Sequence, residues 1–189
     1  MSGGVHGPTI VIDLDGTVLR RGPLDGLRLY LGRKGNAGTA FGELGASLER
    51  LAGRFRIVAV TARARLGRRN TRLWLEREGL GFVELYLSPF FNLTEPGRAK
   101  YKSIVISALR SRGYDIRYGV GDRPSDMRAY AANGAFPVVV LDGEDERRRR
   151  AFERLAARLG LGEDDYAVFV ERPGAPAWKA IADFIEARG

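Results

Sequence analysis

Short apolar runs alternate with helix-periodic segments from one end of this chain to the other. The apolar runs predict strands near residues 9–14, 55–61, 82–88, 116–121, 136–141 and 166–171. The helical period predicts helices near residues 39–52, 65–79, 98–112, 124–133, 144–160 and 176–188. Apolar strands that alternate with helices are typical of a parallel sheet covered on both faces. We therefore expect an α/β protein, a three-layer α/β/α sandwich with a mostly parallel sheet.

The composition fits one globular domain. The chain has 189 residues, 44% of them hydrophobic and 29% charged, which is enough for one substantial core and too short for two ordinary domains. We expect residues 1–189 to form a single domain, with residues 1–8 as a flexible N-terminal tail. Because the sequence contains no cysteine, disulfides, thiolate metal sites and a cysteine nucleophile are excluded.

The sequence also predicts a cytoplasmic protein. Its first residues have neither the basic region nor the apolar region of a secretory signal. No stretch approaches the ~18 uninterrupted apolar residues that a transmembrane segment needs.

Polar residues stand directly at the ends of several apolar runs. In open parallel sheets, ligands bind outside the carboxyl ends of the strands, so these side chains are expected to converge on one crevice. The residues concerned are Asp13, Asp15, Thr61, Asp122 and Asp126.

Asp13 and Asp15 stand two positions apart where the first strand ends. A strand that breaks at a glycine, here Gly16, can aim the first carboxylate at a ligand and swing the second above it. That geometry suits a nucleophile and an acid/base. Mg²⁺ takes oxygen ligands, so one side-chain carboxylate and a backbone carbonyl of this loop could hold it. The alternative is a strand followed by an ordinary Asp-Gly turn.

Taken in order, these segments resemble the four motifs of the haloacid dehalogenase-like (HAD) superfamily of phosphatases. The matching residues are Asp13-Leu14-Asp15-Gly16-Thr17, Thr61, a lysine near residue 100, and Gly121-Asp122 with Asp126. The resemblance covers Ile10 to about Leu141. It implies a Rossmann-like core, Mg²⁺ as cofactor and a phospho-aspartyl intermediate.

A weaker similarity points to one group within that superfamily, the LNS2 domain of lipin-type phosphatidate phosphatases and phosphatidylinositol-transfer proteins. The similar segments are Thr61-Ala62-Arg63-Ala64, Tyr101-Lys102 and Gly121-Asp122-Arg123-Pro124-Ser125-Asp126. This chain has Asp122 where that group often has asparagine.

Phosphoryl transfer needs an in-line nucleophile, charge neutralisation and a proton for the leaving group. We expect Asp13 to be the nucleophile, forming an acyl phosphate that water hydrolyses, and Asp15 to be the acid/base. A lysine would cancel charge between Asp13 and the phosphoryl group. Lys100 and Lys102 compete for this role, and Lys102 is favoured because Tyr101-Lys102 matches the LNS2-like pattern.

Thr61, Ala62 and Arg63 are the residues expected to bind the substrate phosphate. The Thr61 hydroxyl and the Ala62 amide could both donate to phosphate oxygens. On spacing alone, Thr61 is better explained as the N-cap of the helix expected to begin near Arg65. The two roles can coexist, since helix N-termini bind anions.

Asp122 and Asp126 are expected to complete the Mg²⁺ site with Asp13 and Asp15. Asp126 lies one helical turn after Asp122 and would bind the ion directly or through water. The alternative for both is helix capping, because aspartates are favoured near the first turn of a helix that opens with Pro124.

Arginines gather around the strand and helix that carry Thr61. The net charge of +8 suits anionic partners, and we expect these arginines to form a rim that binds a second phosphate or a polyanionic backbone. They are Arg54, Arg56, Arg63, Arg65, Arg68, Arg69 and Arg72. The run 147–150 is instead expected to be a solvated helix face with i,i+4 ion pairs.

The HAD-like phosphatases carry their lids either just after the first acidic motif or between the second and third. Residues 18–54 and 63–99 leave no room for a folded lid, so we expect no cap or a minimal one. An open site admits a large or polyanionic phosphorylated substrate, such as a nucleic-acid end or a lipid headgroup.

Together these patterns predict a Mg²⁺-dependent phosphomonoester hydrolase. The alternative is a non-catalytic module that binds phospholipid or nucleic acid through the arginine rim. Asp15 distinguishes the two, because a binding module has no need of an acid/base two positions after Asp13.

Overall fold

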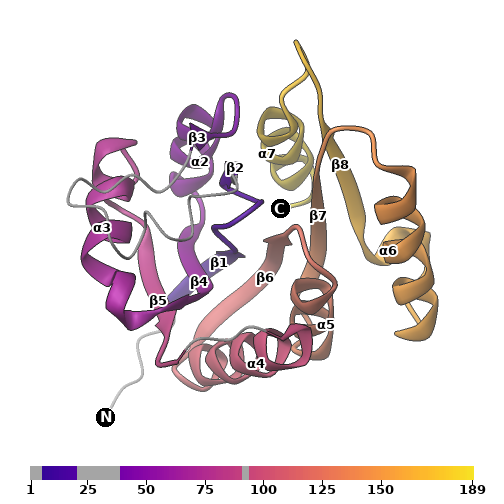
Figure 1. The fold of residues 1–189 in the computed structure, drawn as a ribbon, viewed down its shortest axis with the longest axis horizontal. Coiled ribbons are helices and arrows are strands. Elements are labelled where there is room, and N and C mark those ends of the chain that lie inside the picture. The colour runs from indigo at the N-terminus through magenta and orange to yellow at the C-terminus, as the bar shows by residue number, and fades with distance from the viewer. Residues whose placement is uncertain (1–5, 21–38, 91–93) are drawn as a thin grey trace.

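A six-stranded parallel sheet forms the centre of the protein (Figure 1). We describe residues 6–20, 39–90 and 94–189 of a computed structural model. The strands of the sheet are β1 (His6–Ile12), β4 (Arg56–Ala64), β5 (Glu84–Ser88), β6 (Tyr114–Gly121), β7 (Phe136–Asp142) and β8 (Ala167–Glu171). Their order is β5-β4-β1-β6-β7-β8, and every neighbouring pair is parallel. The predicted sheet is thus confirmed.

Helices cover both faces of this sheet (Figure 1). They are α2 (Leu44–Ala52), α3 (Arg68–Arg77), α4 (Glu95–Ser111), α5 (Pro124–Ala132), α6 (Glu146–Arg158) and α7 (Ala177–Arg188), with 3₁₀ turns at Arg65–Gly67 and Glu163–Asp165. Side chains alternate across β1, so Ile10 and Ile12 pack with α2, α3 and α7 while Val11 packs with α4 and α5. Helix α6 packs with α5 against β7 and β8. This confirms the three-layer α/β/α sandwich.

The order of the strands locates the crevice where a ligand is expected. The chain winds outward from β1 to β4 and β5 on one side, and to β6, β7 and β8 on the other. The direction of winding therefore reverses between β1 and β6. In doubly wound sheets such a switch point, at the carboxyl ends of the strands, is the usual ligand site.

Three boundaries differ from those expected. The helix expected from residue 39 begins at Leu44, because Glu43 has a left-handed φ of 53° and Thr39–Ala40 form β3, which pairs antiparallel with β2 (Leu19–Arg20). Residues 6–8, expected in the tail, belong to β1. Helix α4 begins earlier than expected, since Thr94 caps it by accepting from the amide of Gly97 at 3.2 Å.

The expectation of little or no cap concerns two segments. Between Thr61 and Lys102, the described residues form the first 3₁₀ turn, α3, β5 and the start of α4, which belong to the sheet and its helical layers. Much of the other segment, residues 21–38, lies outside the described residues. Among the helices of residues 6–20, 39–90 and 94–189, none combines the length and the apolar character needed to cross a membrane.

Candidate active site

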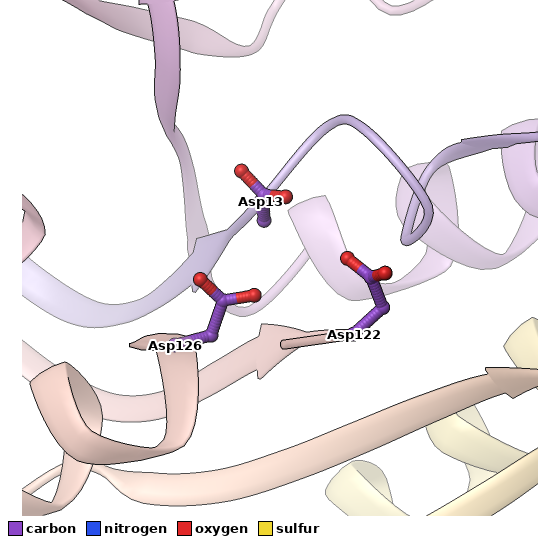
Figure 2. A group of neighbouring side chains, drawn as sticks. All are labelled: Asp13, Asp122 and Asp126. Carbon is purple, nitrogen blue, oxygen red and sulfur yellow. The ribbon is translucent and has the colours of Figure 1, made fainter. Parts of the chain in front are cut away.

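Three acidic side chains meet at the switch point. Asp13 directly follows β1, Asp122 directly follows β6, and Asp126 lies in the first turn of α5. Each contributes one carboxylate oxygen to a group whose atoms lie within 4.8 Å of one another. Figure 2 shows the three carboxylates converging from separate segments of the chain. Because β1 and β6 are neighbours, the fold joins residues that are far apart in sequence.

The Lys102 ammonium lies against this acidic group. Its Nζ is 2.7 Å from Asp13 Oδ1 and 2.5 Å from Asp126 Oδ1, and the residue is 1% exposed. Lys102, Ile106 and Leu109 form the buried stripe of α4, whereas Lys100 faces solvent. Of the two lysines that compete in the sequence, Lys102 is therefore the one that contacts Asp13.

Asp126 caps a helix as well as joining the acidic group. Its Oδ1 accepts a hydrogen bond from Lys102, while its Oδ2 accepts the backbone N–H of Arg123 at 3.1 Å and so caps α5. The two explanations offered by the sequence coincide in this residue. Asp122 does not cap α5, because the N-cap residue is Arg123.

Burial raises the pKa values of Asp13 and Asp122, and the positive charge nearby is too small to reverse the shift. Burial is the largest influence on Asp13 and, with Asp126 and Asp122, raises the pKa of Asp13 to about 7, although Lys102 opposes the shift. Burial and then Asp126 raise the pKa of Asp122 to about 6. Burial alone would lower the pKa of Lys102, but Asp126 and Asp13 raise it above its ordinary value. One lysine therefore does not offset the combined effect of burial and of repulsion among the carboxylates.

The acidic group fits a divalent cation such as Mg²⁺. Hard cations prefer carboxylate oxygens, and Mg–O bonds of about 2.1 Å place two ligand oxygens at most about 4.2 Å apart. Oxygens that now lie within 4.8 Å of one another need to close by only about half an ångström to reach that range. The positive charge would also offset burial and the repulsion from neighbouring carboxylates, which raise the pKa values of Asp13 and Asp122. Asp13, Asp122 and Asp126 are the residues that could hold the ion.

The Asp15 carboxylate lies outside this group because Arg63 holds it. Arg63 donates from Nε to Asp15 Oδ2 at 2.9 Å and from Nη2 to Asp15 Oδ1 at 2.6 Å. A third bond, from Nη1 to Thr71 Oγ1 at 3.2 Å, fixes the guanidinium. The side chain of Asp15 is therefore not gathered with the other expected metal ligands. The Arg63 side chain, expected to bind substrate phosphate, binds Asp15 instead.

Thr61 is a buried strand residue and not a helix cap. Strand β4 continues to Ala64, and the 3₁₀ turn and α3 that follow have Ala64 and Gly67 as their N-caps. The capping role favoured by spacing is therefore wrong. The Thr61 Oγ1 atom accepts the backbone N–H of Arg63 at 3.3 Å, and Ala62 between them is partly exposed.

Gly16 allows the first acidic loop to pass closely over Asp122. It has a φ of +88°, and a Cβ added there would lie 2.3 Å from Asp122 Oδ2. The next residue, Thr17, donates its hydroxyl to Asp122 Oδ1 at 3.3 Å, and its carbonyl accepts from Trp178 Nε1 of α7 at 2.8 Å. The pattern of α7 identifies Trp178 only as a core residue, so this contact could not be found from the sequence.

Arg148 is a further residue at the site that the sequence does not single out. Two of its neighbours make the i,i+4 pairs expected of a solvated face, Arg149 with Glu153 and Arg150 with Glu146. Arg148 instead donates from Nη2 to the carbonyl oxygen of Asp122 at 2.7 Å and to its Oδ2 at 3.3 Å. One feature of the sequence could have identified it. Arg148 lies in the first turn of the helix that follows β7, at the same edge of the sheet as Asp122.

The expected arginine rim is smaller than the sequence predicts. Arg54 and Arg56 lie at the amino end of β4, about 16 Å or more along the strand from Thr61. Arg72 donates to backbone carbonyls near β5, and Arg63 is bound to Asp15. The exposed arginines that remain near the end of β4 are Arg65, Arg68 and Arg69. We call these three the arginine rim.

Arg65 brings the rim close to the site. Its charge, with that of Lys102, lowers the pKa of Tyr101 against the larger effect of burial, which raises this pKa to about 12. Arg65 therefore lies within electrostatic reach of the helix that carries Lys102.

The chain matches no protein-family model, and no curated protein matches it by sequence. Solved structures match by fold. A haloacid dehalogenase-like family hydrolase from Streptococcus pneumoniae has a TM-score of 0.56 at 14% identity, over 97% of this chain and 100% of its own. The HAD domain of effector protein Lem4 from Legionella pneumophila has a TM-score of 0.51 at 15% identity, over 98% and 96%.

A chain of the Pnkp1/Rnl/Hen1 RNA repair complex also matches, with a TM-score of 0.53 at 14% identity over 71% of this chain. The match spans 42% of that longer chain. The parallel sheet, its switch point and these structural matches agree with the sequence motifs. The protein has the fold of the haloacid dehalogenase-like hydrolases.

Proposed function

We propose that this protein is a Mg²⁺-dependent phosphomonoester hydrolase that acts through an aspartyl-phosphate intermediate. The observation that carries the proposal is the contact of Lys102 with Asp13 inside the group of Asp13, Asp122 and Asp126. A buried carboxylate beside both a cation and a candidate metal site is what a phosphoryl acceptor needs, since like charges otherwise keep the phosphate away. A bound Mg²⁺ would neutralise charge on the transferring phosphoryl group.

Asp13 is the proposed nucleophile. One of its carboxylate oxygens forms a bond to phosphorus while the bond from phosphorus to the leaving oxygen breaks. Lys102 lies 2.7 Å from Asp13 Oδ1 and would keep its charge beside the phosphoryl oxygens through the step. Water then attacks the acyl phosphate, which releases inorganic phosphate and restores the carboxylate.

Asp15 is the proposed acid/base. It donates a proton to the leaving oxygen in the first step and takes one from the attacking water in the second. Its two bonds to Arg63 fix the direction of the carboxylate, so Arg63 is proposed as a positioning residue. A carboxylate held in one orientation transfers its proton along one line, which lowers the entropy cost of the step.

Thr61 and Ala62 are the proposed phosphate-binding residues. The Thr61 oxygen already accepts from the backbone of Arg63, which leaves its hydroxyl proton to be donated to a phosphate oxygen. The amide of Ala62 follows Thr61 in the same strand and would supply a second donor.

A screen of phosphorylated compounds tests this function. It includes nucleotides, oligonucleotide ends, lipid phosphates and an aryl phosphate, first with Mg²⁺ and then with a chelator. We expect turnover that the chelator abolishes and that falls by about 10³ or more in Asp13→Asn, since removal of a nucleophile costs this much. Absence of turnover on all of them would leave the binding module as the better reading.

A polyanionic substrate is favoured by the arginine rim and by one structural match, whose name places it in an RNA repair complex. Replacing Arg65, Arg68 and Arg69 with glutamate should raise KM for a 5′-phosphorylated oligonucleotide more than KM for a small aryl phosphate. Equal effects on the two substrates would count against the rim as a binding surface. The similarity to the LNS2 domain stays a prediction, which the lipid phosphates in the screen address.

A further inference from the structure

A cavity of about 410 Å³ opens beside the proposed acid/base. Its walls include Asp15, Gly16 and Asp122 at the reaction centre, and Arg20 and Arg148 farther out. Small-molecule sites have volumes of roughly 300–1,000 Å³, so part of a substrate can enter it. Because an acid/base must reach the oxygen that leaves, the leaving group occupies space next to Asp15. The cavity is therefore the natural place for the leaving group.

Arg148 is held in this wall mainly by a neutral partner. Its shorter hydrogen bond, 2.7 Å, goes to the backbone carbonyl of Asp122, and the bond to the Asp122 carboxylate is 3.3 Å. Both bonds come from Nη2. Among residues 6–20, 39–90 and 94–189, no atom accepts a hydrogen bond from its Nε or Nη1, and the side chain is 39% exposed. The guanidinium is thus oriented yet keeps donors that can bind an anion.

The other two arginines that line the cavity, Arg20 and Arg123, are already committed. Arg123 donates from Nη1 to Glu95 Oε1 at 3.2 Å. Arg20 lies 3.5 Å from Asp142 and 3.2 Å from Glu171, and its guanidinium stands over the ring of Phe41. Because its guanidinium is engaged in these contacts, Arg20 is less able to bind a ligand. Arg148 is therefore the better candidate for a residue that recognises the substrate.

We propose that Arg148 binds a second anionic group carried by the leaving group. The substrate class is then a phosphomonoester with a carboxylate or a phosphodiester close to the phosphate that is removed. The proposal rests on the proposed function, which sets the position of the leaving group. The N–H groups left on Nε and Nη1 can donate to either kind of anion, so the shared chemistry is an oxyanion bound by charge-assisted hydrogen bonds.

Matched substrates that differ only in the second anion test the proposal. One pair is 3-phosphoglycerate and glycerol 3-phosphate, and the other is 5′-phosphorylated dithymidylate with a phosphodiester linkage and the same compound with an uncharged methylphosphonate linkage. We expect kcat/KM to be at least about tenfold higher for the member with the second anion in one pair, as a charge-assisted hydrogen bond allows. The preferred pair tells whether the anion is a carboxylate or a phosphodiester.

Variants of α6 assign this preference to one side chain. Arg148→Gln should abolish the preference, and Arg148→Lys should keep part of it. Arg147→Gln is the matched control, because it removes the same charge from an exposed neighbour on the same helix and should leave the preference intact. If Arg148→Gln lowers kcat/KM equally for both members of each pair, Arg148 only steadies Asp122 and the proposal is overturned.

Binding without turnover separates this proposal from the proposed function. Calorimetry on Asp13→Asn should give a Kd at least about tenfold lower for the preferred doubly anionic compound than for its partner, and Arg148→Gln should remove the difference. Turnover with no preference in either assay overturns the role of Arg148 and leaves the hydrolase standing. If Asp13→Asn shows the binding preference but the unmodified chain hydrolyses neither compound, the proposed hydrolase function is overturned and the role of Arg148 stands.

Discussion

The guanidinium of Arg63 binds the carboxylate of Asp15 through two hydrogen bonds of 2.9 and 2.6 Å, in a position where both side chains are nearly buried. Paired N–H donors fix the plane of a carboxylate as well as its distance. The first acidic loop is thereby tied to the end of β4, and the direction of Asp15 depends on a residue from the next strand of the sheet.

Replacing Arg63 by lysine should lower kcat by about 10- to 100-fold, because lysine cannot reproduce the two parallel bonds. Asp15→Asn should cost about 10²–10⁴. The double variant should be no slower than Asp15→Asn alone, since both changes remove one function. Thr71→Val is the control, because it breaks only the third Arg63 bond and should reduce thermal stability more than kcat. Losses that multiply in the double variant would contradict a positioning role.

Gly16 should tolerate no side chain. An added Cβ would lie 2.3 Å from Asp122 Oδ2, and the φ of +88° adds backbone strain. Gly160→Ala is a matched control, because Gly160 has a φ of +70° and no described atom within 4 Å of such a Cβ. It should cost about 1 kcal/mol with activity kept. Gly16→Ala should lose most Mg²⁺-dependent activity in the same assays, and a result equal to that of Gly160→Ala would contradict the close contact.

Mg²⁺ should stabilise the protein more at pH 7.5 than at pH 5.5. Burial raises the pKa of Asp13 to about 7, against the opposing effect of Lys102, and raises that of Asp122 to about 6, both from an ordinary value of 3.8. The folded metal-free protein then binds protons that the unfolded chain has lost. Through this contribution its free energy of unfolding falls as pH rises from about 4 to about 7.

A bound cation takes the place of those protons, and protons compete with it at low pH. Thermal unfolding with Mg²⁺ or chelator at both pH values measures the effect. Asp126→Asn, which removes one candidate ligand, should reduce the Mg²⁺ shift at pH 7.5. An equal Mg²⁺ shift at the two pH values would contradict the assignment of the raised pKa values to the metal site.

Trp178→Phe should destabilise the protein more than Trp74→Phe. Both tryptophans are fully buried, but Trp178 donates to the Thr17 carbonyl at 2.8 Å, whereas the Trp74 nitrogen has no hydrogen-bond partner among the described residues. A buried carbonyl left without a donor costs about 1–3 kcal/mol. Urea unfolding of both variants measures the difference. Equal losses would mean that the bond to Thr17 adds nothing beyond packing.

The fold could be predicted from the sequence because its strands are buried on both faces. Such strands read as continuous apolar runs, and their alternation with helices leaves few arrangements of the chain. The boundaries that failed depend on local chemistry. Glu43 has a left-handed conformation that no sequence pattern predicts. The signal for the start of α4 consists of only two residues, Thr94 and Pro96.

The acidic residues could be predicted for a similar reason, since each stands at the end of a strand or in the first turn of a helix. Lys102, the partner of Asp13, could also be predicted, but the arginine partners of the acidic residues could not. Arg63 and Arg148 belong to arginine-rich stretches whose arginines all have the same chemistry, and only the fold decides which guanidinium turns inward. Arg54 and Arg56 could have been excluded from the rim, because the strand expected at residues 55–61 already places them at its amino end, away from Thr61.

The most direct test of the account is whether Asp13 carries phosphate during turnover. The protein is mixed with Mg²⁺ and a radiolabelled phosphomonoester that it hydrolyses, quenched in acid within the first turnover, and assayed for label bound to protein. The account predicts label that hydroxylamine removes and that Asp13→Asn does not acquire. Turnover that proceeds without labelled protein and persists undiminished in Asp13→Asn would contradict it.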